Sequence, residues 1–467
     1  MTSLLEKIVD FNNQIDFNDL PSKIKDDLKS RFLDTLGICI AASKSDFSNE
    51  INAFMKEFAN SNENCSVFGL DKKASLEMAV FSNGSYAHSL DFDDTHIGAV
   101  THPSSVIFST AWSIAEEKNS TIQEFTEAVF SGLTTMLIVG DQTVAKEGNK
   151  NSILTTHGFH PTSVVGTLGA ATVASKLLKL DKEQTISAHG IAVSQSSGLI
   201  EANKTGHSVK RIHAGWAAMS GVMAAKLALA GVTGPTSALD GELGFLKAFC
   251  GVSNEIEEIT AKTVYKYFDQ LTYKPYPTNA YIHGAIDGIM SCVKENNVNS
   301  NNIKRINVGL STTQKQITFE PASVKKNPPS AYAARFSMPF VLASVIVRQE
   351  GSLRLVDFND DAINDSEMKK VMDKIEAYVD PEMEDIFPQA FPANIDIELT
   401  DGTRVHKKIT TNFGMPTNPV THEYLVRKFK DNTENVIEQE KSNVIIDIIE
   451  NLYDYKSFNE ISNSIFN

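Results

Sequence analysis

Long apolar segments alternate with short polar ones through the first half of the chain. The apolar segments carry their hydrophobic side chains at helical spacing, and they cover residues 22–43, 75–90, 103–118, 133–144, 161–180, 185–200 and 213–231. The polar segments between them include residues 91–102, 145–160 and 201–213. We therefore predict that residues 1–250 are all-helical and that these three polar segments meet at one end of a helical bundle.

The pattern changes after about residue 265. Residues 306–312 alternate apolar and polar side chains, which is typical of a half-buried strand. Residues 394–409 form two such runs joined by Asp401-Gly402, which predicts a β-hairpin with a type I′ turn. Helical segments are expected around these strands, at about residues 279–295, 337–349 and 363–378, and again in the amphipathic tail after residue 443.

These patterns predict a mainly α fold with an α+β second domain. Two domains are also expected from length, because 467 residues are too many for one compact core. The large all-helical domain would cover residues 1–266 and 410–467, since the tail is expected to return to the helices of the first half. The smaller α+β domain, residues 267–409, would then be an insertion.

Two histidine–proline pairs stand at the start of apolar segments. Residues 102–106 read HPSSV and residues 160–164 read HPTSV. Proline fits the first turn of a helix and keeps the preceding residue out of the helical conformation, so His102 and His160 are expected at cap positions. A helix start presents free N–H groups and a positive dipole end, which suits an anion. The pairs predict two imidazoles directed at one pocket, although two ordinary capped helices would give the same pattern.

The overall charge excludes some partners and leaves others open. A formal net charge of −15, without a basic tract, argues against nucleic acid as a partner. A locally basic pocket for a small anion is still compatible with it. Four scattered cysteines without a CxxC pair are typical of reduced thiols, and no apolar run reaches membrane-spanning length. We expect a cytoplasmic protein that binds neither nucleic acid nor a membrane.

The polar segment at 90–103, LDFDDTHIGAVTHP, is rich in ionisable side chains. It lies between two apolar segments, so its polar groups must be satisfied internally or by a ligand. A solvated acidic turn is the alternative. A metal site is disfavoured, because the acidic and imidazole groups match no standard ligand spacing. The chain also has no GxGxxG, GxxxxGK(S/T), GxSxG or HExxH motif.

The remaining candidates form a set for proton transfer on a polyanion. His102 and His160 can exchange protons near neutral pH, and Asp91 could orient one of them or act as a base. Lys210 and Lys274, the latter in the stiff sequence YKPYP, could each bind a carboxylate, although a lone lysine is often a solvated surface side chain. Three histidines within apolar segments are instead expected to be hydrogen-bonded core residues: His189, His213 and His283.

Several motifs resemble, in order along the chain, those of the MmgE/PrpD family. They are NGSYAHSLDFDDTH (83–96), THPSS (101–105), HGFHPTSVVGTLGAA (157–171), VKRIHAGWAA (209–218) with TGP (233–235), KPYP (274–277) and ARFSMPF (334–340). The resemblance implies an all-helical domain with an α+β lid, a homodimer, and neither a metal nor an organic cofactor. It also implies activity on small di- and tricarboxylates, as in 2-methylcitrate dehydratase, cis-aconitate decarboxylase and iminodisuccinate epimerase.

Matched motif by motif, the resemblance assigns functional roles to six residues. The catalytic residues would be Asp91, His102 and His160, and the substrate-binding residues Thr95, Lys210 and Lys274. The sequence at 213–215, His-Ala-Gly, differs from the Trp-Lys-Gly of the dehydratase branch, which favours decarboxylation over dehydration. We expect a cofactor-independent lyase most like a cis-aconitate decarboxylase that forms itaconate. A methylcitrate-type dehydratase, an epimerase and a non-catalytic carboxylate-binding dimer are the alternatives.

Overall fold

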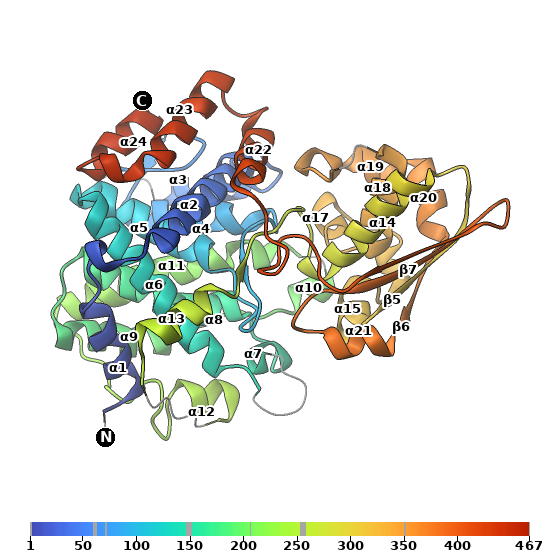
Figure 1. Ribbon diagram of the computed structural model, residues 1–467. Coiled ribbons are helices and arrows are strands. Elements are labelled where there is room, and N and C mark those ends of the chain that lie inside the picture. The colour runs from blue at the N-terminus through green and yellow to red at the C-terminus, as the bar shows by residue number, and fades with distance from the viewer. Residues whose placement is uncertain are drawn as a thin grey trace.

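The structure is a computed structural model of the chain. It describes residues 2–58, 63–70, 72–145, 152–205, 207–252, 258–349 and 352–466, so part of the predicted polar segment at 145–160 lies outside the described residues. The predicted fold class is confirmed: the chain is mainly helical, with a small mixed sheet in its C-terminal half (Figure 1).

The first half of the chain is helical, apart from short strands. Its helices are α1 (Leu4–Asn13), α2 (Ser22–Ala42), α3 (Ser48–Glu57), α4 (Leu76–Ser89), α5 (Pro103–Lys118), α6 (Ile122–Gln142), α7 (Ile153–Thr156), α8 (Pro161–Leu177), α9 (Lys182–Gln195), α10 (Ala202–Thr205), the 3-10 helix η2 (Ser208–Ile212), α11 (His213–Leu229), α12 (Phe245–Cys250) and α13 (Ala261–Phe268). The short strands pair as β1 (Cys65–Ser66) with β2 (Lys73–Ala74), and β3 (Thr95–His96) with β4 (Leu271–Thr272).

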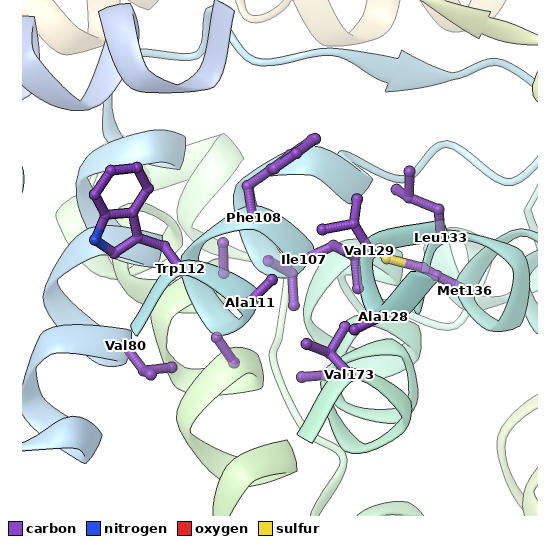
Figure 2. Packing of buried hydrophobic residues seen from close by; sticks show 14 of the residues in the cluster. Val80, Ile107, Phe108, Ala111, Trp112, Ala128, Val129, Leu133, Met136 and Val173 are labelled. Atoms are coloured by element: carbon purple, nitrogen blue, oxygen red, sulfur yellow. The ribbon is translucent and has the colours of Figure 1, made fainter. Parts of the chain in front are cut away.

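Helix α8 stands at the centre of this half and packs against α5, α6, α9 and α11. Large side chains of α5, such as Trp112 and Phe108, fill one side of the core (Figure 2). Small residues allow closer approach elsewhere. A Cβ added to Gly84 of α4 would lie 2.7 Å from Cα of Gly215 in α11, so the two backbones meet directly. The small residues in the apolar segments therefore set the spacing of the helices.

Local capping chemistry fixes several helix starts. His102 and His160 occupy the cap positions of α5 and α8, each followed by a proline in the first turn, as predicted. Asp181 forms a reciprocal capping box with Gln184 at the start of α9.

The C-terminal half contains the sheet. Its strands are β5 (Ile303–Leu310), β6 (Ile375–Val379), β7 (Ala393–Leu399) and β8 (Arg404–Ile409), in the order β6-β5-β7-β8. Strand β5 runs parallel to β6 and antiparallel to β7, which pairs with β8 as a hairpin. The helices of this α+β part are α14 (His283–Asn296), α15 (Thr312–Thr318), α16 (Ala322–Lys325), α17 (Ala331–Ala334), α18 (Met338–Arg348), α19 (Asp360–Asn364), α20 (Ser366–Asp373) and α21 (Pro381–Ile386).

Two local predictions in this part were wrong. The helix expected at 363–378 ends at Asp373, and the next residues form β6, because they pair with β5. The β7–β8 hairpin is present, but its turn is not type I′. The Leu399 N–H donates to the Thr403 carbonyl, and the Gly402 N–H donates to the Leu399 carbonyl. Only Gly402 in this loop has a positive φ, of 90°. A type I′ turn requires positive φ at both central residues.

Buried apolar side chains form two large cores. The first, which we call the helical body, draws on residues 4–271 and 429–465, and the second on residues 276–405. Helices α22 (His422–Thr433), α23 (Gln439–Glu450) and α24 (Phe458–Phe466) pack against α2 and α5 of the helical body (Figure 1). The domain boundaries at 266 and 409 stay a prediction, because shared packing does not show which segments fold as units. None of the helices described is long and apolar enough to cross a membrane.

Candidate active site

A cavity lies between the helical body and the α+β part. It is lined by all six residues that the sequence singled out: Asp91, Thr95, His102, His160, Lys210 and Lys274. Its volume is about 80 Å³, and since one water needs roughly 10–15 Å³ on this scale, it has room for several waters or a small organic acid. Each of the three polar segments of the first half contributes to the lining, as predicted.

Asp91 lies between two lysine side chains. Nζ of Lys210 is 2.6 Å from Oδ1, and Nζ of Lys274 is 3.0 Å from Oδ2 and donates to the Asp91 backbone carbonyl as well. All three side chains are buried. Burial opposes ionisation of Asp91, but the two ammonium groups outweigh it and hold its pKa well below the usual range. The lysines expected to bind a substrate thus already share one protein carboxylate, which leaves this triad with one net positive charge.

The backbone around Asp91 explains how these groups meet. Asp91 has a positive φ of 53°, which ends the run of helix α4 and turns the chain. Strand β3 then pairs with β4, with Thr95 opposite Thr272. Lys274 comes shortly after β4 in the sequence, and Asp91 comes shortly before β3, so the pairing of these strands brings the two side chains together. Sequence analysis had no signal for this two-residue strand pair.

Asp94 caps α5 from the same loop. Its carboxylate accepts hydrogen bonds from the backbone N–H and the hydroxyl of Ser104, at 3.1 and 2.6 Å, and from the Arg31 guanidinium at 2.8 Å. A protein carboxylate therefore caps the start of α5. The sequence predicted instead that this helix start would be free to bind an anionic ligand. Arg31 also binds Asp27 and stacks on Tyr273, 4.5 Å from the ring centre.

Lys428 supports the site from the C-terminal helix α22. Its Nζ lies 2.7 Å from Asp34 Oδ1 and donates to the backbone carbonyls of Phe92 and Lys274, at 3.1 and 3.0 Å. One buried ammonium thus contacts two of the three chain segments that carry the Asp91 triad, those of Asp91 and Lys274. Sequence analysis missed Lys428, because nothing near it in the sequence marks it as part of the site.

His102 has a defined proton position. Its Nδ1 lies 2.7 Å from the backbone carbonyl of Asp94, and a carbonyl only accepts, so Nδ1 carries the proton. The Thr95 hydroxyl is 3.3 Å from the same nitrogen. Burial lowers the pKa of His102 to about 3. The resting ring is therefore neutral, with the lone pair on Nε2, and it is a weaker base than an ordinary histidine.

His160 contacts a second histidine. Its Nδ1 lies 2.9 Å from Nδ1 of His213, so one ring must donate and the other accept. Burial holds the pKa of His160 well below its usual range and lowers that of His213 to about 3. His213 is buried and hydrogen-bonded, as expected of a core histidine, but its partner is a cavity residue. Sequence analysis therefore missed its place in the site.

Asp93, rather than Asp91, is the carboxylate that contacts the imidazoles. Its Oδ2 lies 2.7 Å from Nδ1 of His88, and its Oδ1 lies 3.8 Å from Nδ1 of His102. We had expected Asp91 to orient one of the cavity imidazoles, but its two oxygens are occupied by lysines. Positions 91 and 93 are close in the sequence, so only the conformation of the folded loop shows that Asp91 binds lysines and Asp93 binds an imidazole.

The remaining histidines of interest are not among the residues that line the cavity. His189 is a hydrogen-bonded core residue, as predicted, with Thr172 and the Thr185 carbonyl as partners. His283 is also buried, but its Nε2 has no hydrogen-bond partner within the residues that the structure describes. His157 is exposed and binds the Phe249 carbonyl.

The α+β part closes the other side of the cavity. Sequence analysis missed these residues, since they come from loops and a short helix without a chemical motif: Asn279, Ala280, Tyr281, Ile317, Pro388 and Phe391. In the described parts of the chain, no three His, Cys, Asp or Glu side chains are arranged to hold a metal ion. The acidic residues at 91, 93 and 94 are instead matched by lysines, an imidazole and an arginine.

Comparison with protein families agrees with the motifs. The MmgE/PrpD N-terminal domain matches residues 6–257, and the MmgE/PrpD C-terminal domain matches residues 276–454. The chain belongs to the MmgE/PrpD family. The resemblance inferred from the sequence motifs is thereby confirmed.

Named relatives of this MmgE/PrpD protein cover most of its length. Cis-aconitate decarboxylase of Homo sapiens is 29% identical over 441 residues, which span 91% of this chain and 87% of that protein. The Mus musculus protein of the same name is 27% identical over 467 residues, or 97% and 91% of the two chains. Cis-aconitate decarboxylase of Aspergillus terreus is 24% identical over 452 residues, or 92% and 89%.

Proposed function

We propose that this MmgE/PrpD protein is a cofactor-independent lyase acting on a small di- or tricarboxylate, most like a cis-aconitate decarboxylase that forms itaconate. The observation that carries the proposal is the meeting of two buried lysines and two imidazoles in one small cavity. The names of its relatives, which are 24–29% identical, support the choice of substrate.

Substrate binding would use the positive charge left on the lysine–Asp91 triad. Lys210 and Lys274 can each donate a further hydrogen bond, because an ammonium group has three protons. A substrate carboxylate beside them would be held without displacing Asp91. The Thr95 hydroxyl offers a further donor to a second carboxylate, and the positive end of the α8 dipole, behind His160, favours an anion there.

In decarboxylation, the bond between the substrate skeleton and one carboxylate breaks and CO2 leaves. The electron pair stays on the product, and a proton must reach carbon. His102 rests with its lone pair on Nε2, so it must first take up a proton before it can donate. His160 carries its proton on Nε2 whenever His213 donates through Nδ1, and we assign His160 as the proton donor to carbon. The role of Asp91 is to hold both lysines in place, and its charge raises the pKa of Lys210 against the opposing effect of burial.

The test is incubation with cis-aconitate, 2-methylcitrate and iminodisuccinate, with the products followed by NMR. We expect itaconate and CO2 from cis-aconitate. His160→Gln should lower this rate by on the order of 10²-fold or more, whereas His157→Gln, an exposed histidine nearby, should not change it. Failure of the wild-type protein to convert cis-aconitate would refute the decarboxylase.

The other outcomes identify the alternatives. Water loss from 2-methylcitrate indicates a dehydratase, and loss of stereochemical purity in iminodisuccinate indicates an epimerase. Calorimetric binding of all three without any turnover indicates a non-catalytic carboxylate-binding protein.

Assembly as a homodimer and a cytoplasmic location are also part of the proposal. Exposed apolar side chains on α11, Trp216, Met223 and Leu229, support an interface between copies. Sedimentation at micromolar concentration tests this, and a purely monomeric protein would refute it.

A further inference from the structure

Four imidazole rings form a contiguous array that begins in the wall of the cavity and continues behind it. His88 lies between His102 and His160, with ring centres 5.1 and 5.3 Å away, and His213 follows at 5.0 Å from His160. Two of these rings line the cavity, while His88 is fully buried behind them. The function proposed above uses His102 and His160 and gives no role to His88 or to Asp93.

Asp93 has an unusual set of contacts for a buried carboxylate. Its Oδ2 accepts a hydrogen bond from Nδ1 of His88, and its Oδ1 has no hydrogen-bond partner within the described chain. Nε2 of His88 likewise has none. A buried charge is costly unless it is paired. Because the partner of Asp93 is an imidazole rather than a lysine or an arginine, a proton added to His88 would complete the pair.

Burial lowers the pKa of His88, and the adjacent Asp93 carboxylate opposes that shift. Among the rings of the array, its position at a helix end makes His88 the better place for a charge. His88 lies in the last turn of α4, where the negative end of the helix stabilises a cation. His102 and His160 stand at the first turns of α5 and α8, where a cation is disfavoured. The groups that face His88 from the surrounding elements are Asp91, Asp93, Lys210, His102, His160, His213 and, beyond Asp93, the thiol of Cys39. Asp93 is the carboxylate closest to the array.

We propose, building on the function proposed above, that His88 and Asp93 hold the proton that the cavity imidazoles deliver to the substrate. When a tricarboxylate loses CO2, the C–C electron pair stays on the product and takes a proton from a cavity imidazole to form a C–H bond. His88 then gives its proton to that imidazole, and it regains one from water after the product leaves. His88 and Asp93 are positioning residues in this scheme, since the cavity lining does not include them.

Ring NMR tests where the proton resides without requiring turnover. The protein is labelled with 15N in its histidine rings and measured free and saturated with tricarballylate, a tricarboxylate that lacks the reactive double bond. We expect both ring nitrogens of His88 to carry protons in the complex, with the signal assigned by its loss in His88→Gln. Asp93→Asn should return the ring to one proton. A His88 ring that is neutral in both samples overturns the proposal.

Kinetics with cis-aconitate test whether that proton is used. His88→Gln and the near-isosteric Asp93→Asn should each lower kcat by on the order of 10²-fold while KM changes less than about threefold. The matched control is His189→Gln, a buried, hydrogen-bonded histidine away from the cavity, which should keep the wild-type kcat. Thermal unfolding shows that each variant is folded.

The possible failures can be told apart. If the wild-type protein converts cis-aconitate and both variants keep kcat within about threefold, the proton-holding role is refuted and the proposed function stands. If the wild-type protein converts none of the polycarboxylates, the proposed function is refuted, and ring NMR alone decides which imidazole carries the proton.

Discussion

Replacing Lys428 by methionine tests how the site is held together. The ammonium group of Lys428 is buried and lies 2.7 Å from Asp34, and it donates to the carbonyls of Phe92 and Lys274. Removing it leaves the Asp34 carboxylate buried without its direct partner. Breaking a buried pair in this way costs about 3–5 kcal/mol of unfolding free energy. Within that loss, each carbonyl that loses its donor accounts for about 1 kcal/mol.

The loss in Lys428→Met should depend on pH. Burial already raises the pKa of Asp34, with Lys428 opposing it, so removal of Lys428 raises that pKa further. Above the unfolded pKa of about 4, the folded variant then binds a proton that the unfolded chain does not. Stability falls as pH rises wherever the folded state binds more protons. The loss should therefore be smaller at pH 5 than at pH 8.

Urea unfolding at both pH values gives the measurement, with the double variant Lys428→Met/Asp34→Asn as a cycle. We expect the double variant to recover at least half of the loss, because it no longer buries an unpaired carboxylate. Lys430→Met on the same helix is exposed and should stay within about 0.5 kcal/mol of wild type. A loss below about 1 kcal/mol at pH 8, or one that does not vary with pH, would contradict the reasoning.

Other substitutions address the remaining contacts. Asp91→Asn leaves two buried lysines without a counter-charge, so stability at pH 7 should fall by roughly 3–5 kcal/mol, and tricarballylate should raise the melting temperature more than in wild type. The low pKa of Asp91 stabilises the fold above the unfolded pKa, and this stabilisation is lost as pH falls through the folded value, so the variant should show a flatter acid limb in urea unfolding. His213→Leu should lower kcat on cis-aconitate by at least about tenfold with little change in KM, whereas His213→Asn, which can still donate, should retain more. Gly215→Ala would place Cβ 2.1 Å from the Phe81 carbonyl, and urea unfolding should show a loss of roughly 1–3 kcal/mol or more.

Local chemistry accounts for the parts of the fold that the sequence predicted. The caps at His102 and His160 follow from the proline that comes next, and the helical first half follows from spacing within each segment. Strand β6 was missed, because its short sequence becomes a strand only by pairing with β5, far away in the chain. The hairpin at 393–409 was found, but its turn type depends on one backbone angle that Asp-Gly does not determine alone.

The sequence predicted which residues line the site, but it did not predict which of their side chains contact one another. All six residues chosen from the motifs line the cavity, since each lies next to a helix start or a break in the pattern. Which group pairs with which could not be predicted, because Asp91 and Asp93 lie in a loop without a period. Their directions follow from a positive φ at Asp91 and from the β3–β4 pair. Lys428 acts on this loop from the other end of the chain, and no local pattern reveals that.

The three acidic residues of this loop have partners of different basicity, and this separates fixed charge from mobile charge. Asp91 is bound by two lysines, and Asp94 is bound by Arg31. An arginine side chain is far more basic than an imidazole. Asp93 is bound by the imidazole of His88, whose pKa is lowered by burial while Asp93 opposes that shift. The pairs of Asp91 with its two lysines hold the loop and the positive charge that an anion needs. Burial raises the pKa of Asp94 to about 6 even though Arg31 opposes the shift. A proton can therefore enter and leave at Asp93 and His88 without loosening the groups that bind the substrate.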